Sequence, residues 1–269
     1  MSRVLELHLL FASIVWIAAW LLTSMPRVSA TAKYWIWVAT AFNFVLPLSA
    51  LPARWWPSRV GWFVAPLGVE GVSRNLAGVW IAGALVMFVR LVWRLRRVGP
   101  AGGPAVVGFV RPEIHLPADI DALLTRDELD AVLIHERRHA ARRDNLICLA
   151  HEVALCLLWF HPLVWLTRTR LALYRELSCD EAAIRRGRGE ELVAALGKIA
   201  HCDAALFQAG ASSFVRDRVA HFAAARTASR ATTALIAIAF GVVLSIAIVS
   251  PIAQAAAAYT CALAHGLAR

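Results

Sequence analysis

Residues 125–145 read TRDELDAVLIHERRHAARRDN, and this stretch decides how the polar part of the chain folds and what it can bind. Thr125 with a glutamate three residues later is a capping box, which predicts that a helix begins there. That helix carries the pattern H-E-x-x-H at His135, Glu136 and His139. Histidines four residues apart share one helix face, so both imidazoles can reach a single Zn2+ ion. The stretch therefore predicts a zinc site on a helix.

The H-E-x-x-H pattern is specific enough to favour a metal site over two surface histidines on an amphipathic helix. In a chain of this composition the pattern arises by chance on the order of 0.01 times. The glutamate also has a chemical role in such a site. Glu136 can take a proton from a metal-bound water and later deliver it to a leaving amine. We therefore predict Glu136 as the general base of a zinc-dependent peptidase.

Two histidines leave room for a third protein ligand and a water, and the sequence offers several candidates. Glu176 and Asp180 lie four residues apart on a later predicted helix, which suits one ligating carboxylate and one that orients an imidazole. We therefore favour Glu176 as the third ligand, supported by Asp180. Cys179 is an alternative, but it projects about 60° from Glu176 on the side away from Asp180. His151 and His161 are further alternatives, placed to line the cleft.

The composition of the whole chain indicates a membrane protein. Of 269 residues 59% are hydrophobic and 17% are charged, and the mean hydropathy is +0.61. Soluble domains have about 45–50% apolar and about 25% charged residues. These values exclude an intrinsically disordered chain and disfavour an ordinary cytosolic enzyme. Four apolar stretches approach the roughly 20 residues that a bilayer-spanning helix needs; they are residues 4–23, 34–51, 76–93 and 231–252.

Most of the charge lies between the third and fourth of these stretches. Residues 94–230 hold 20 of the 28 Lys and Arg and 16 of the 18 Asp and Glu, and arginines stand at both ends of this block. The positive-inside rule therefore places the block in the cytoplasm. The arginines of residues 53–75 fall on the outer side in this topology, and we give the larger cluster more weight. Because the arginines are spread between apolar blocks, we expect no direct nucleic-acid binding.

The predicted organisation follows from these patterns. We expect a membrane domain with three transmembrane helices, a cytosolic metallopeptidase domain, a fourth transmembrane helix and a short extracytoplasmic tail; they occupy residues 1–97, 98–230, 231–252 and 253–269. Within the cytosolic domain, residues 105–116 contain two short β-type runs around Arg111-Pro112, which predict a hairpin. Phe160-His161-Pro162 predicts a break between two helices.

Three motifs together resemble the membrane metallopeptidases of the BlaR/MecR antirepressor type. They are HERRHAARRDNL from residue 135, WFHPLVW from residue 159 and RELSCDE from residue 175. The resemblance covers residues 105–185 closely. It implies a mainly α multi-pass membrane protein with four transmembrane helices and a cytosolic α+β, zincin-like (gluzincin) domain. The site residues that it implies are His135, His139 and Glu176 as zinc ligands, Glu136 as general base, and Asp180 as a supporting residue.

One departure from the family concerns β-lactam binding. Receptors of this type carry a penicillin-binding sensor domain after the fourth span, where about 17 residues follow here. The nucleophile motif S-x-x-K is absent, because Ala30 and Ala195 stand three residues before the only lysines, Lys33 and Lys198. We therefore expect no covalent β-lactam binding. A smaller departure is His161, which takes the place of asparagine in the W-F-N-P pattern.

These observations predict a zinc metalloendopeptidase in the bacterial cytoplasmic membrane that cleaves a cytosolic protein, such as a transcriptional repressor, in regulated proteolysis. One alternative is quality control of membrane proteins, because the heat-shock membrane zinc proteases also join H-E-x-x-H and a glutamate to spanning helices. A second alternative is a non-enzymatic signalling scaffold with a structural zinc site. That alternative is disfavoured because structural sites usually fill all four positions with His or Cys and have no need of Glu136.

Overall fold

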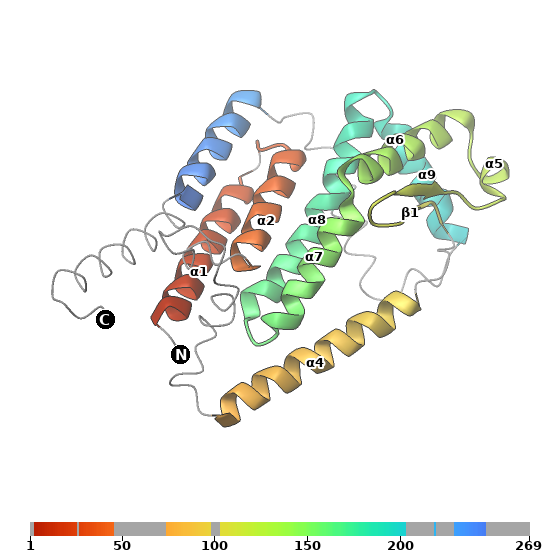
Figure 1. Cartoon of the computed structure of the whole chain (residues 1–269). Helices are drawn as coiled ribbons and strands as arrows, with labels where there is room; N and C mark the ends of the chain where they lie inside the picture. The colour runs from red at the N-terminus through yellow and green to blue at the C-terminus, as the bar shows by residue number, and fades with distance from the viewer. Residues whose placement is uncertain are drawn as a thin grey trace.

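The computed structural model describes residues 3–25, 27–45, 74–97, 103–202, 218 and 229–245. These residues are mostly helical, with one small sheet (Figure 1). The helices are α1 (Arg3–Thr23), α2 (Ala30–Val45), α4 (Arg74–Arg96), α5 (Ile120–Leu123), α6 (Arg126–Arg142), α7 (Asp144–Leu157), α8 (Pro162–Arg185), α9 (Gly189–Cys202) and a further helix, Arg230–Ser245. The strands are β1 (Ala105–Val107) and β2 (Glu113–His115). The predicted mainly helical class with a small β element is confirmed.

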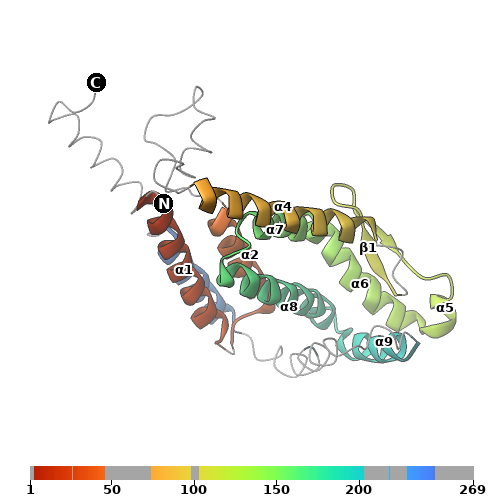
Figure 2. The same cartoon turned by 90° about the horizontal axis from the view of Figure 1, so that it is seen from below.

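Helices α7 and α8 run through the middle of the molecule and connect its two ends (Figure 1). At one end lie α1, α2 and the helix Arg230–Ser245, and at the other lie α5, α6, α9 and the strands. Helix α4 runs alongside α7, as Figure 2 shows from below. The zinc motif on α6 therefore lies where the end that carries the strands meets α8.

The largest hydrophobic core joins the N-terminal helices to α8. Tyr34 and Trp37 of α2 are fully buried there and pack with the buried Leu171 and Leu177 of α8. Phe240 of the helix Arg230–Ser245 belongs to the same core. Helices of the predicted membrane domain and a helix of the predicted peptidase domain thus share one core.

The capping box that opens α6 is confirmed. The Thr125 hydroxyl accepts a hydrogen bond from the backbone N–H of Glu128 at 3.3 Å, and the Glu128 carboxylate accepts one from the Thr125 N–H at 2.7 Å. Lys198 of α9 donates to the same carboxylate at 2.7 Å. The inner face of α6 packs on α5, α8 and α9 in a second core that includes Ala131 and Ile134. The start and the inner face of the zinc helix are therefore fixed in place.

The predicted hairpin is also confirmed. Strands β1 and β2 pair antiparallel, with Ala105 opposite His115. Gly108 has φ +95, and a Cβ there would lie 2.6 Å from the carbonyl oxygen of Arg111, so the turn requires glycine. The side-chain amide of Asn145 donates to the carbonyls of Val106 and Gly108. The hairpin is thereby attached to the start of α7, directly after the zinc helix.

The predicted helix break is present between α7 and α8. Helix α7 ends at Leu157 and α8 begins with Pro162 in its first turn, where a proline costs no hydrogen bond. The apolar residues 146–166 therefore belong to two helices rather than to one span. This arrangement brings the first turn of α7 and the second half of α8 together beside α6.

Helices form in all four predicted spans, but one described helix meets the length and hydropathy of a membrane span, Gly78–Arg96 within α4. Its large apolar side chains are exposed, as expected for a surface in contact with lipid; they include Val79, Ile81, Leu85, Val86, Phe88, Val89 and Trp93. His8–Thr23 and Arg230–Ser245 are shorter apolar helices. Crossing by four helices stays a prediction. The last residues of the second and fourth predicted spans and the tail 253–269 lie outside the described residues.

Candidate metal centre

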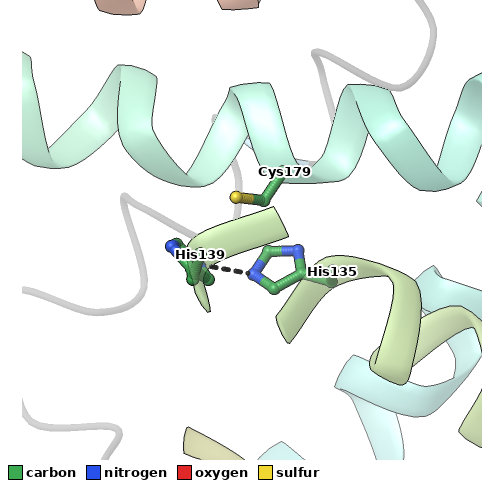
Figure 3. A group of neighbouring side chains, drawn as sticks. All are labelled: His135, His139 and Cys179. Atoms are coloured by element: carbon green, nitrogen blue, oxygen red, sulfur yellow. Dashed lines mark hydrogen bonds between the residues drawn. The ribbon is translucent and has the colours of Figure 1, made fainter. Parts of the chain in front are cut away.

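The two histidines of the H-E-x-x-H motif and Glu176 form a triangle between α6 and α8. Nε2 of His135 lies 3.1 Å from Nε2 of His139 (Figure 3). Oε2 of Glu176 lies 3.4 Å from the first nitrogen and 3.6 Å from the second. Three ligand atoms at the usual distances from a tetrahedral zinc ion are about 3.3 Å from one another. The residues therefore fit a zinc ion.

Cys179 also lies at this site. Ligand atoms of His135, His139 and Cys179 are all within 4.8 Å of one another, and Figure 3 shows the Cys179 side chain extending from α8 toward the histidine pair. Residues three apart are neighbours on a helix surface, so Glu176 and Cys179 both reach α6. The Cys179 sulfur accepts a hydrogen bond from Arg142 at 3.0 Å.

Each histidine has its own carboxylate partner at Nδ1, the ring nitrogen that is not part of the triangle. Oδ1 of Asp180 lies 3.0 Å from Nδ1 of His135, and Oδ2 of Asp144 lies 2.6 Å from Nδ1 of His139. Both carboxylates are buried, with 0% and 2% of the residue exposed. Such partners hold the imidazole ring in place and direct Nε2 toward the metal. Asp180 was predicted in this role, whereas Asp144 was not.

The two orienting carboxylates are each held by an arginine. Arg218 makes a bidentate pair with Asp180, at 2.6 Å and 2.8 Å. Arg142 donates to Oδ2 of Asp144 at 2.6 Å and also to the Ser178 hydroxyl of α8. Pairing offsets the cost of burying these charges. Neither arginine was identified from the sequence. Arg218 is distant from Asp180 in the chain, and Arg142 meets Asp144 only because the chain turns at Arg143.

The electrostatic potential at the histidines favours positive charge. Burial alone would lower the pKa of His139, but hydrogen bonds with Asp144, Cys179 and Glu176 raise it to about 12. Burial alone would raise the pKa of Glu176, yet its hydrogen bonds with the two histidines hold it well below the ordinary value. The potential that attracts protons to these imidazoles attracts a metal cation in their place, since a metal ligates the neutral ring.

Glu136 directly follows His135 on α6 and is buried. Its residue is 9% exposed, and no hydrogen bond or ion pair joins its carboxylate to another residue in the part of the chain that the structure describes. A structural glutamate in a buried position is normally paired. With no partner among the residues that the structure describes, this carboxylate is available to accept a proton.

The alternative histidines lie away from this centre. His161 precedes the first turn of α8 and packs on Phe44, with ring centroids 5.2 Å apart. At the helical rise of about 1.5 Å per residue, His161 lies roughly 22 Å from Glu176 along the axis of α8. His151 is buried on α7, two turns beyond Asp144, and burial lowers its pKa to about 4. Neither residue lines the metal centre.

Comparisons with known proteins find relatives for the segment that carries this centre. The model of the BlaR1 peptidase M56 family matches residues 100–192. The regulatory protein BlaR1 of Bacillus licheniformis is 41% identical over 86 residues, which is 30% of this chain and 14% of that protein. The methicillin resistance mecR1 protein of Staphylococcus aureus is 23% identical over 130 residues, 45% of this chain and 22% of that protein.

The matches thus span less than a quarter of each relative. No solved structure matches the chain significantly. The matched segment contains the H-E-x-x-H motif, Glu176 and Asp180. The segment that holds the metal centre therefore matches the M56 peptidase family, and the protein is a relative of the BlaR/MecR-type membrane peptidases.

Proposed function

We propose that this protein is an integral-membrane zinc metalloendopeptidase that cleaves a cytosolic protein, such as a transcriptional repressor, in regulated proteolysis. The observation that carries the proposal is the triangle of His135, His139 and Glu176, whose edges of 3.1 Å, 3.4 Å and 3.6 Å suit three ligands of one zinc ion. The neighbouring Glu136 of α6 has no partner for its carboxylate among the described residues.

In this proposal the three residues of the triangle hold the metal, and Glu176 is favoured over Cys179 as the third ligand. Its Oε2 is nearly equidistant from both Nε2 atoms, and Arg175 binds only the other oxygen, Oε1. The single sulfur of Cys179 accepts a hydrogen bond from Arg142. Asp180 and Asp144 keep the two rings oriented through Nδ1. Zinc, when bound, polarises the scissile carbonyl and lowers the pKa of a water.

Glu136 supplies the proton transfers. As a carboxylate it accepts a proton from the attacking water, and as the resulting acid it delivers that proton to the nitrogen of the leaving amine. Both transfers need a carboxylate that has no competing partner. Among the described residues, the carboxylate of Glu136 has none. This also argues against a scaffold with a purely structural zinc site, which requires no such base.

The membrane location is supported by α4. Its outward apolar side chains and the basic last turn with Arg94 and Arg96 are typical of a spanning helix that ends at the cytoplasmic surface. We therefore propose a multi-pass protein of the bacterial cytoplasmic membrane with the metal centre on the cytoplasmic side. The names of the two relatives, a regulatory protein and a resistance protein, favour signalling over quality control.

The test compares cells that express the wild type, Glu136→Gln or Glu152→Gln. Glu152 pairs with Arg94 and Arg168 away from the metal centre, so its variant controls for the same chemical change. New protein N-termini are identified by mass spectrometry. We expect cleavage of one dominant cytosolic protein, reduced at least about 100-fold by Glu136→Gln only.

Two outcomes would contradict the proposal and indicate a different function. Accumulation of many misfolded membrane proteins in the Glu136→Gln cells would indicate quality control. A zinc-loaded wild type that yields no Glu136-dependent fragment would indicate a scaffold.

A further inference from the structure

Helix α2 reaches the metal centre through Tyr34. This tyrosine is fully buried, and its hydroxyl donates a hydrogen bond to Oδ1 of Asp144 at 2.7 Å. The other oxygen of the same carboxylate, Oδ2, lies 2.6 Å from Nδ1 of His139. An uninterrupted chain of short contacts therefore runs from Tyr34, the first residue of the second predicted span, to a proposed zinc ligand.

The carboxylate of Asp144 has no freedom to replace this partner. It is 2% exposed at the first position of α7, where Arg142 and His139 share Oδ2 and Tyr34 binds Oδ1. The Arg142 guanidinium also lies over the Tyr34 ring, 4.3 Å from its centroid. Without the tyrosine hydroxyl, Oδ1 is a buried acceptor that has lost its partner, and such atoms are costly. The carboxylate is then held by fewer hydrogen bonds and orients the ring of His139 less firmly.

A second contact on the same face of α2 fixes its register along α8. The backbone N–H and the hydroxyl of Thr31 donate to Oε2 of Glu181, at 2.9 Å and 2.8 Å. Glu181 directly follows Asp180, which orients His135. Thr31 and Tyr34 are three residues apart and so lie on one face of the helix. A shift of α2 by one residue, about 1.5 Å, would break both contacts.

We propose that Tyr34 is a positioning residue of the metal centre, which transmits the position of α2 to the zinc ligand His139 through Asp144. The inference rests on the zinc site of the proposed function and adds to it a physical route from the N-terminal helices to the metal. Coupling of this kind is reciprocal, so the docked position of α2 strengthens zinc binding and zinc binding stabilises that position.

The experiment measures zinc affinity of the full-length protein in detergent by competition with a chelator of known affinity. The matched variants are Tyr34→Phe and Tyr174→Phe. Tyr174 is a buried tyrosine of the same core, but its hydroxyl donates to the Thr23 carbonyl at 3.4 Å, away from the metal. Loss of an outer partner of a ligand typically weakens metal binding about 10–100-fold. We expect the zinc affinity to fall about tenfold in Tyr34→Phe and less than about twofold in Tyr174→Phe.

Two further readouts separate positioning from general loss of structure. Cobalt bound in place of zinc reports ligand geometry, and its visible spectrum is expected to change in Tyr34→Phe but not in Tyr174→Phe. In a double-mutant cycle, Tyr34→Phe adds no further loss of affinity to Asp144→Asn, because the two residues act in one chain. Independent, additive effects in the cycle, or equal losses in the two tyrosine variants, would overturn the inference.

Failure of this inference is distinguishable from failure of the proposed function. If the wild type binds no zinc, the proposed function is wrong. If the wild type binds zinc and Tyr34→Phe binds it equally well with an unchanged cobalt spectrum, only the role of Tyr34 is wrong.

Discussion

Oε2 of Glu176 on α8 lies 3.4 Å from Nε2 of His135 on α6, although the two residues belong to helices separated by α7 in the chain. The hairpin of α7 and α8 creates this proximity, because it returns the chain to the zinc helix after the break at Pro162. The third ligand is therefore supplied by tertiary structure, and its identity can be tested against the neighbouring Cys179.

Glu176→Gln is expected to lower zinc affinity by at least about 100-fold, because a neutral amide replaces a charged ligand. Cys179→Ser is expected to retain zinc at the wild-type level. X-ray absorption at the zinc edge should show nitrogen and oxygen donors at about 2.0–2.1 Å. A sulfur shell at about 2.3 Å that disappears in Cys179→Ser would identify Cys179 as the third ligand instead.

Asp180→Asn is expected to weaken zinc binding about 10–100-fold, because the amide does not hold His135 as the carboxylate does. The control is Asp127→Asn, which changes an exposed carboxylate paired with Arg188 at the start of α6. Isothermal titration of the metal-free proteins with zinc provides the comparison. Equal affinities of the two variants would show that Asp180 has no orienting role.

The sequence was sufficient for elements whose signals are local. The capping box at Thr125, the hairpin around Arg111 and the break at Pro162 each depend on a few neighbouring residues, and each was confirmed. The two histidines of α6 face the same side for the same reason, since helical spacing fixes it.

Contacts that depend on a turn or on the packing of helices were not predictable in this way. Asp144 follows His139 by five residues, but only the αL turn at Arg143, with φ 54, directs it back to the imidazole. Tyr34 reaches the centre through the packing of α2 on α8, which no local pattern encodes. The position of Cys179 depends on how closely α6 and α8 approach, which the sequence does not specify.

Thr125→Ala is expected to destabilise the protein by about 1 kcal/mol, because it removes the hydroxyl that caps α6. Thr169→Ala is the matched control, since that exposed hydroxyl donates only to the Leu166 carbonyl within α8. Thermal denaturation in detergent gives the difference. Zinc content at room temperature should be unchanged in both variants, and a similar loss of stability in the two would contradict a specific role for the cap.

The burial of His151 leads us to expect that the protein loses stability in acid. Burial lowers its pKa from 6.5 to about 4, and its Nε2 has no hydrogen-bond partner among the described residues. Above pH 6.5 the ring is neutral in both the folded and unfolded states. As the pH falls toward 4, the unfolded state gains a proton that the folded state does not, so stability falls by up to about 3 kcal/mol.

The measurement compares thermal stability of the wild type and His151→Phe across this pH range, with chelator present so that zinc release does not contribute. Carboxylates affect both proteins alike, and the difference between them reports His151. The variant should lose less stability than the wild type between pH 6.5 and 4. Parallel curves would show that His151 does not contribute.

The zinc content of the purified full-length protein, measured by atomic emission, tests the central claim most directly. We predict about one zinc ion per chain in the wild type and in Glu136→Gln, and less than about a tenth of that in a His135→Ala, His139→Ala double variant. A wild type that contains no zinc after purification without chelators, or a double variant that retains it in full, would contradict the account.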